Sequence, residues 1–207
     1  MNKHLVEQAG TPLRLIFWGG LLCLFDFSFS QTTNGRGFQF DVLNDALGMI
    51  LITIGVFRLS VLPVHGRYAT VMKFVQITSV LALLDAFRKH VVMPLPPVAY
   101  FAFNLFGIAT LAATVVFCVA MRWFCEEANL REPARSWSVT TLLFTVIYLV
   151  PLGVLNVLAA SAVASGTSFN LNLGSAGSAL LLVFAVPLLH FFVSTTRMKR
   201  AAAAVGE

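Results

Sequence analysis

The sequence predicts an all-α bundle of six membrane-spanning helices, and three observations carry this prediction. Apolar residues make up 58% of the 207 residues, charged residues make up only 11%, and the mean hydropathy is +0.84. The apolar residues form blocks of roughly the 20 residues that a helix needs to cross a bilayer, instead of the one-sided stripe of a soluble helix. The basic residues stand at the ends of these blocks, as charges at a membrane surface do.

Six apolar runs form the predicted spans of a single membrane domain, residues 1–207. The spans are residues 13–30, 42–62, 68–93, 98–125, 137–164 and 176–195. Proline ends the second and third runs, at Pro63 and Pro94, because a helix interior cannot accept its ring or its missing N–H. The other connections are polar, and the first contains the helix breakers Asn34-Gly35. These connections are residues 31–40, 126–136 and 165–175.

The basic residues predict the orientation of the bundle. Six spans place both termini on one side of the membrane. With the termini in the cytoplasm, eleven of the 14 Lys and Arg residues lie inside, and only Arg36, Arg88 and Lys89 lie outside. This asymmetry follows the positive-inside rule and predicts an N-in, C-in topology.

Polar residues gather at the outer ends of the predicted helices. An ionised side chain in hydrocarbon costs roughly 2.5–3.5 kcal/mol at mid-helix, so such residues face the bundle interior or each other. We therefore expect a ligand or proton site in the outer half of the bundle, with Arg88 as a counter-ion to the acids. The candidate residues are Asp26, Asp45, Asp85, Arg88 and Asn104.

A second interpretation of the same residues needs no ligand. Asp41 would cap the second helix, Arg88 and Lys89 would extend to the lipid headgroups, and Asp45 would pair with a basic residue to fix helix packing. Both interpretations remain open from the sequence.

Two glycines predict a close helix–helix contact. Gly48 and Gly55 are seven residues apart in the second run, so they lie on nearly the same helix face. Small residues in this arrangement let a neighbouring helix approach closely. The partner helix can belong to the same chain, to a second copy or to another membrane protein.

Catalytic and metal-binding motifs are missing from the sequence. It contains neither HExxH nor GxSxG, and Cys23, Cys118 and Cys125 lie apart in apolar runs with no CxxC spacing. His190 follows Pro187 by one turn, and we expect it either to carry protons or, more simply, to bond a backbone carbonyl freed by the proline. We therefore expect no enzyme activity, no metal and no cofactor.

The basic residues are scattered between the runs, whereas a nucleic-acid-binding protein gathers them on one soluble face. The lipid bilayer is the expected partner, and nucleic acid is not.

The stretch Phe40–Gly55 reads FDxLxDxxGxxLxxxG and is preceded by Asp26. It resembles a pattern in small bacterial multi-pass membrane proteins without an established activity, which often carry proline where this chain has Asn44. The resemblance covers about a fifth of the chain and implies a location in the bacterial inner membrane. A looser analogy of span count and topology links the chain to the substrate-binding subunits of vitamin importers.

These observations predict a multi-pass inner-membrane protein that binds or transports a small solute through a polar site in the outer half of the bundle. The alternative is a structural or assembly subunit of a membrane complex that has no ligand of its own.

Overall fold

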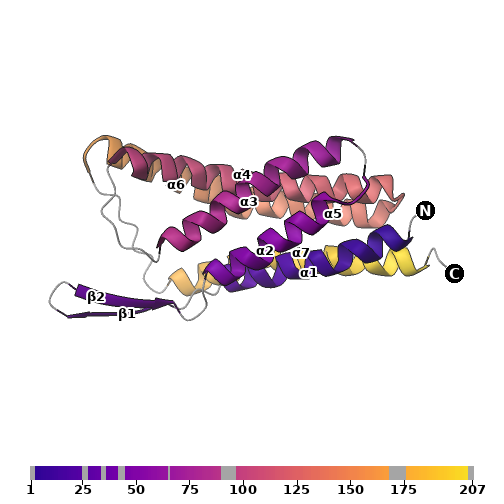
Figure 1. The fold of residues 1–207 in the computed structure, drawn as a ribbon, viewed down its shortest axis with the longest axis horizontal. Coiled ribbons are helices and arrows are strands. Elements are labelled where there is room, and N and C mark those ends of the chain that lie inside the picture. Colours follow the sequence, from indigo (N-terminus) through magenta and orange to yellow (C-terminus); the bar gives the residue numbers. More distant parts are fainter. Residues whose placement is uncertain are drawn as a thin grey trace.

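The computed structural model describes residues 3–24, 28–33, 36–41, 45–64, 66–89, 97–167 and 176–204. Within these residues the chain forms long helices and one short β-hairpin (Figure 1). The elements are α1 (Lys3–Leu24), β1 (Ser28–Thr33), β2 (Arg36–Asp41), α2 (Asp45–Ser60), α3 (Gly66–Lys89), α4 (Pro97–Glu127), α5 (Arg131–Leu143), the π-helix η1 (Phe144–Leu149), α6 (Val150–Ala164) and α7 (Ala176–Ala204).

The helices form a closed ring. α1 packs on α2, α2 on α3, α3 on α4, α4 on α5 and α6, α5 on α7, and α7 returns to α1. α5, η1 and α6 follow one another without a break, so the described chain has six helical rods. Both termini lie at one end of the bundle, and the hairpin projects from the other (Figure 1). We call these the terminal end and the hairpin end.

The predicted all-helical character is confirmed for the bundle, but the predicted start and end of the first helix were wrong. The first helix begins at Lys3 instead of residue 13, and it ends at Leu24 instead of residue 30. The predicted polar turn at 31–40 is mostly an antiparallel hairpin, in which Ser28 pairs with Asp41 and Thr33 with Arg36. Asn34-Gly35 separates the two strands in the sequence, and such a dipeptide between strands is a strong hairpin signal.

The π-helix ends two residues before Pro151. Proline has no N–H to donate, so the helix lacks one backbone hydrogen bond at this position. The Val150 N–H bonds the Thr145 carbonyl, five residues back. This wider turn sets the positions of Phe144 and Tyr148, which both face the interior of the bundle.

The turn between α4 and α5 is tightly fixed. Asn129 adopts a left-handed conformation, with φ of 61°. The Leu130 N–H bonds the Cys125 carbonyl at 2.8 Å, and the Asn129 N–H bonds the Glu126 carbonyl at 3.0 Å. This pair of bonds is the Schellman arrangement that ends a helix. The predicted polar connector 126–136 is therefore mostly helical, and α5 begins at Arg131.

The close-packed core lies toward the terminal end of the ring. Its largest fully buried side chains include Trp137, Tyr68, Phe124, Met72 and Met121. Trp137 stacks edge-to-face on Phe191 of α7 at 5.2 Å between ring centroids. Large side chains therefore fill this half of the ring.

Three helical segments in the described part of the chain are long and apolar enough to cross a membrane. They are Gly66–Phe87, Leu105–Glu127 and Arg131–Ala162. The outer surface of the last segment carries an apolar stripe at helical spacing, in which Leu142 is 61% exposed and Val154 is 54% exposed. Such a surface is unfavourable in water and favourable in lipid.

Candidate functional site

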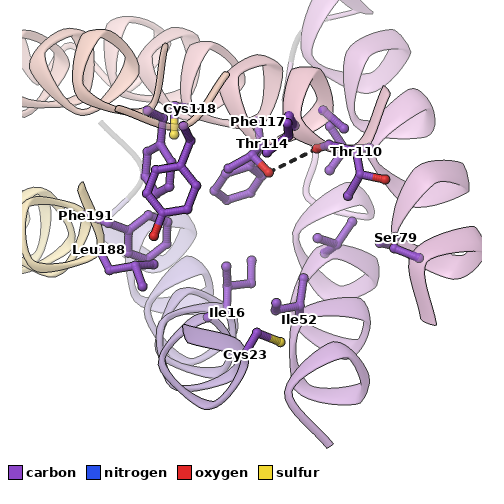
Figure 2. A pocket seen from close by; sticks show the side chains of 18 of the residues that line it. Ile16, Cys23, Ile52, Ser79, Thr110, Thr114, Phe117, Cys118, Leu188 and Phe191 are labelled. Carbon is purple, nitrogen blue, oxygen red and sulfur yellow. Dashed lines mark hydrogen bonds between the residues drawn. The ribbon is translucent and has the colours of Figure 1, made fainter. Parts of the chain in front are cut away.

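A chamber of about 290 Å³ lies inside the ring, on the hairpin side of the packed core. It is walled by α1, α2, α3, α4, η1 and α7 (Figure 2). Most of the wall is apolar, as Figure 2 shows for Ile16, Ile52, Phe117, Leu188 and Phe191. None of the described residues that line the chamber is charged. The chamber is therefore suited to an apolar guest or to the apolar part of a larger molecule.

The hydroxyl groups in the wall are already engaged as donors. Ser79 Oγ donates to the Gln76 carbonyl at 2.8 Å, and Thr110 Oγ1 donates to the Phe106 carbonyl at 3.1 Å. Thr114 Oγ1 donates to the Thr110 carbonyl at 3.2 Å (Figure 2). Each hydroxyl has one proton, so toward the chamber these groups can only accept a hydrogen bond.

Tyr148 links the π-helix to α7 at the chamber wall. Its hydroxyl donates to the Phe184 carbonyl at 2.7 Å, three residues before Pro187. Its ring packs edge-to-face on Phe184, with ring centroids 5.1 Å apart. The tyrosine thus holds the wall together at a point where Pro187 weakens the backbone hydrogen bonding of α7.

Two of the predicted site residues, Asp45 and Asp85, lie just beyond the chamber toward the hairpin end. Asp45 is the first residue of α2, and Met49, one turn later, lines the chamber. Asp85 follows the lining residue Ala82 by three residues on α3. Neither acid lines the chamber itself; Asp45 shares a helix face with Met49, and Asp85 follows the chamber wall of α3 by less than one turn. Both are partly buried.

The last turn of α1 lies close to Asp45. Cys23 Sγ, which lines the chamber, lies 3.8 Å from the Asp45 carbonyl oxygen. The chamber therefore reaches the last turn of α1 and the first turn of α2.

The other predicted site residues are only partly described. Asp26 lies outside the described residues. Arg88 is in the last turn of α3 and Asn104 is in the second turn of α4, but their side chains are also outside the described part. Their backbone positions are at the hairpin end.

Gly48 and Gly55 both face α1 of the same chain. A Cβ atom on Gly48 would lie 2.7 Å from the Gly19 carbonyl oxygen, and one on Gly55 would lie 2.7 Å from the Pro12 carbonyl oxygen. The two helices could not be this close with a larger residue at either position.

A buried hydroxyl network joins α5 to α7, and sequence reasoning missed it. Ser136 Oγ lies 2.7 Å from Ser194 Oγ, and Thr140 Oγ1 lies 2.9 Å from both Ser194 Oγ and His190 Nδ1. His190 therefore bonds a threonine hydroxyl and not the freed backbone carbonyl that we expected as its simplest partner. Ser136 and Thr140 are four residues apart, as are His190 and Ser194, and this shared spacing is the signal available in the sequence.

Comparisons with protein-family models, with curated proteins and with solved structures give no match to this chain. Among the described residues, no group of three His, Cys, Asp or Glu side chains is placed to hold a metal ion.

Proposed function

We propose that this protein is a multi-pass membrane protein that binds or passes a small molecule through the chamber. The apolar body of the ligand would occupy the chamber. Asp45 and Asp85 would act on its polar group or on a proton at the hairpin end, with Arg88 as their counter-ion. The observation that carries this proposal is the hollow between the packed core and the acids, because helices in a purely structural bundle pack to near-crystalline density.

The proposed arrangement in the membrane has six spans, with both termini in the cytoplasm of a bacterial cell and the hairpin outside. Support comes from the three segments of spanning length, the apolar outer stripe and the ring order of the six rods. The hairpin end would then be the entrance from the outer side.

The free energies of apolar burial and of association indicate which contacts a ligand needs. A guest that loses about 200 Å² of apolar surface gains about 5 kcal/mol, at roughly 25 cal/mol per Å². Association costs at least about 4 kcal/mol in lost translational and rotational freedom. Apolar contacts alone therefore give weak binding, and the acids at the hairpin end would supply both affinity and selectivity. A molecule with an apolar body and one polar end fits this division best.

The test is to fill the chamber with a larger side chain and to measure which bound small molecule the protein no longer retains. Full-length wild type, Ala82→Phe and Ala102→Phe would be purified from native membranes, and small molecules extracted from each would be compared by mass spectrometry. Ala82 lines the chamber, whereas Ala102 of α4 is exposed and serves as the matched control. We expect a compound that is retained by wild type and Ala102→Phe and lost from Ala82→Phe.

The double variant Asp45→Asn with Asp85→Asn tests the acids in the same assay. We expect at least about a tenfold loss of the retained compound, equivalent to about 1.4 kcal/mol. Identical extracts from all four proteins would contradict the proposal.

A further inference from the structure

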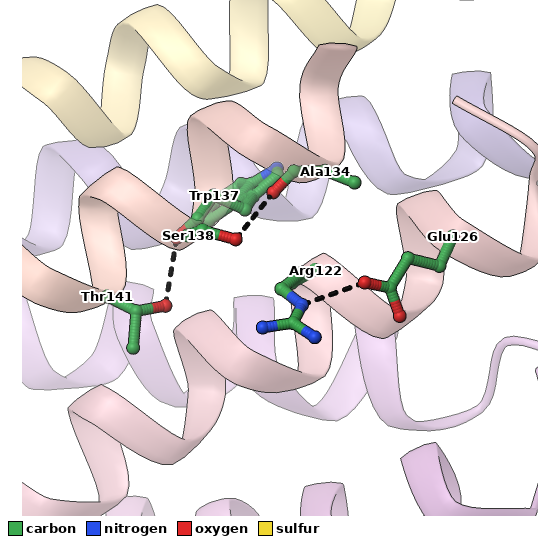
Figure 3. A network of polar contacts seen from close by, with 6 residues as sticks. All are labelled: Arg122, Glu126, Ala134, Trp137, Ser138 and Thr141. Carbon is green, nitrogen blue, oxygen red and sulfur yellow. Dashed lines mark hydrogen bonds and ion pairs between the residues drawn. The ribbon is translucent and has the colours of Figure 1, made fainter. Parts of the chain in front are cut away.

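A second pocket, of about 380 Å³, lies at the terminal end, where α4 turns into α5. It is lined by three arginines, Arg122, Arg131 and Arg135, together with Glu126, Asn129 and Ser138. Figure 3 shows that Arg122 and Glu126 come from α4 and Ser138 from the neighbouring α5, and all three line the pocket. The pocket is separate from the chamber, and it shares none of the chamber's lining residues.

The fold brings these charges together in a fixed geometry. The Schellman turn through Asn129 reverses the chain within three residues, so that the start of α5 lies beside the end of α4. On α5, Arg131, Arg135 and Ser138 follow one another at spacings of four and three residues and share one helix face. The guanidinium groups of α5 therefore face the groove that Arg122 borders.

The lining carries a net positive charge. Arg122 Nε bonds Glu126 Oε1 at 2.8 Å, which neutralises one of the three arginines. Both side chains of this pair are more than 40% exposed, at 43% and 48%, so the ion pair is weak enough to rearrange around a ligand. Arg131 and Arg135 make no salt bridge within the described part of the chain. The acids Glu127 and Glu132 do not line the pocket.

The beginning of α5 adds to this positive potential. Leu130 precedes the helix and has no polar side-chain atom that could cap it. The amides of the first turn therefore lack a side-chain acceptor from that position, and the positive end of the helix dipole, which Glu132 in the same turn partly offsets, favours an anion there. Ser138 Oγ uses its proton on the Ala134 carbonyl, at 3.1 Å.

We propose that this pocket binds a phosphate-bearing anion between Arg122, Arg131 and Arg135. Guanidinium groups match the oxygens of phosphate in paired hydrogen bonds, which a single ammonium group cannot reproduce. The phosphate can belong to the headgroup of an anionic phospholipid or to a free phosphate compound. Basic pockets between helices at a membrane surface recognise lipid headgroups by this chemistry. The pocket is independent of the chamber, so the two proposals fail separately.

The experiment compares two charge-neutralised variants of the full chain in detergent. One carries Arg131→Gln and Arg135→Gln in the pocket. The control carries Arg58→Gln and Arg67→Gln, which remove equal charge at the same end of the bundle but outside the pocket. Native mass spectrometry would measure the retention of added phosphatidylglycerol against phosphatidylcholine, and thermal unfolding would measure stabilisation by inorganic phosphate.

We expect the pocket variant to lose about tenfold or more in affinity for the phosphate probe, and the control to stay within about twofold of wild type. Selective loss of phosphatidylglycerol identifies a lipid headgroup as the ligand, and selective loss of phosphate stabilisation identifies a free phosphate. Equal losses in both variants would reflect general charge and would overturn the proposal, as would no loss in either. Replacing the two pocket arginines by Lys tests the geometry, because Lys keeps the charge and loses the paired hydrogen bonds.

Discussion

Gly19 of α1 and Gly48 of α2 lie so close that each excludes a side chain from the other. A Cβ atom on Gly19 would lie 2.5 Å from the Gly48 carbonyl oxygen, and one on Gly48 would lie 2.7 Å from the Gly19 carbonyl oxygen. This contact fixes the crossing of the two helices beside Cys23, which lines the chamber. The spacing of α1 and α2 at the chamber therefore depends on glycine, which has no side chain, at both positions.

Replacing Gly48 by Ala should destabilise the bundle. The added methyl group has backbone on one side and Cys23 on the other, so the helices must separate, at a cost of about 1–3 kcal/mol. Gly153→Ala in α6 is the control, because nothing lies within 4 Å of its added Cβ. That variant should unfold at the wild-type midpoint temperature or above it, since alanine favours the helix over glycine by up to about 1 kcal/mol. Thermal unfolding in one detergent measures both variants, and an equal shift in the two would contradict the close contact.

The three natural cysteines should report on the chamber without any substitution. Cys23 is partly buried and lines the chamber, Cys118 lines it but is fully buried, and Cys125 is fully buried outside it. We expect N-ethylmaleimide to label Cys23 first, Cys118 more slowly and Cys125 last. Timed labelling followed by peptide mass spectrometry gives the three rates. Labelling of Cys125 as fast as that of Cys23 would mean that the reagent enters by another route.

Removing the Ser194 hydroxyl should weaken the contact between α5 and α7. Ser194 is fully buried and bonds both Ser136 and Thr140, so Ser194→Ala leaves two buried hydroxyls with one partner fewer. Interhelical hydrogen bonds in membrane proteins average about 0.6 kcal/mol and reach about 1.7 kcal/mol. We expect a loss of about 1–2 kcal/mol in the free energy of unfolding, near the upper end because two bonds are lost.

Ser161→Ala is the matched control for this measurement. Ser161 is exposed, and its hydroxyl bonds only the Leu158 carbonyl of its own helix. Its removal should change the free energy of unfolding by less than about 0.5 kcal/mol. If both serine variants unfold alike, the network contributes nothing to the packing of α7.

Hydropathy predicted the helical rods well because long apolar blocks have few other stable structures. It failed at the first helix, where the mixed polar and apolar segment before Leu13 continues the same helix, and its apolar residues Val6 and Ala9 are buried in the core. The hairpin was missed because Asn34-Gly35 was interpreted only as a helix break. In each case the local pattern allowed two structures, and the contacts of the whole fold selected one.

The chamber could not be predicted from the sequence. Its wall takes residues from six elements, from Ile16 in α1 to Phe191 in α7, and a cavity depends on how those elements are spaced. The sequence did single out Asp45 and Asp85 as candidates, because charged residues near the ends of apolar runs are conspicuous, and their role stays a prediction. It gave no indication that an apolar hollow lies beside them. The α5–α7 network was equally hidden, since Thr140 and His190 are 50 residues apart.

The pairing of α1 with α7 bears on the order in which the protein is assembled during translation. The two helices run antiparallel along a shared seam, with Gly10 against Lys199, Phe17 against Phe192 and Gly20 against Leu188. α1 leaves the ribosome first and must wait for α7, so its seam stays uncovered while the intervening helices are made. Nascent chains stalled before α7 should lack a complete wall around the hollow and should be cleared by membrane proteases. The seam thus makes formation of the chamber depend on completion of the last helix.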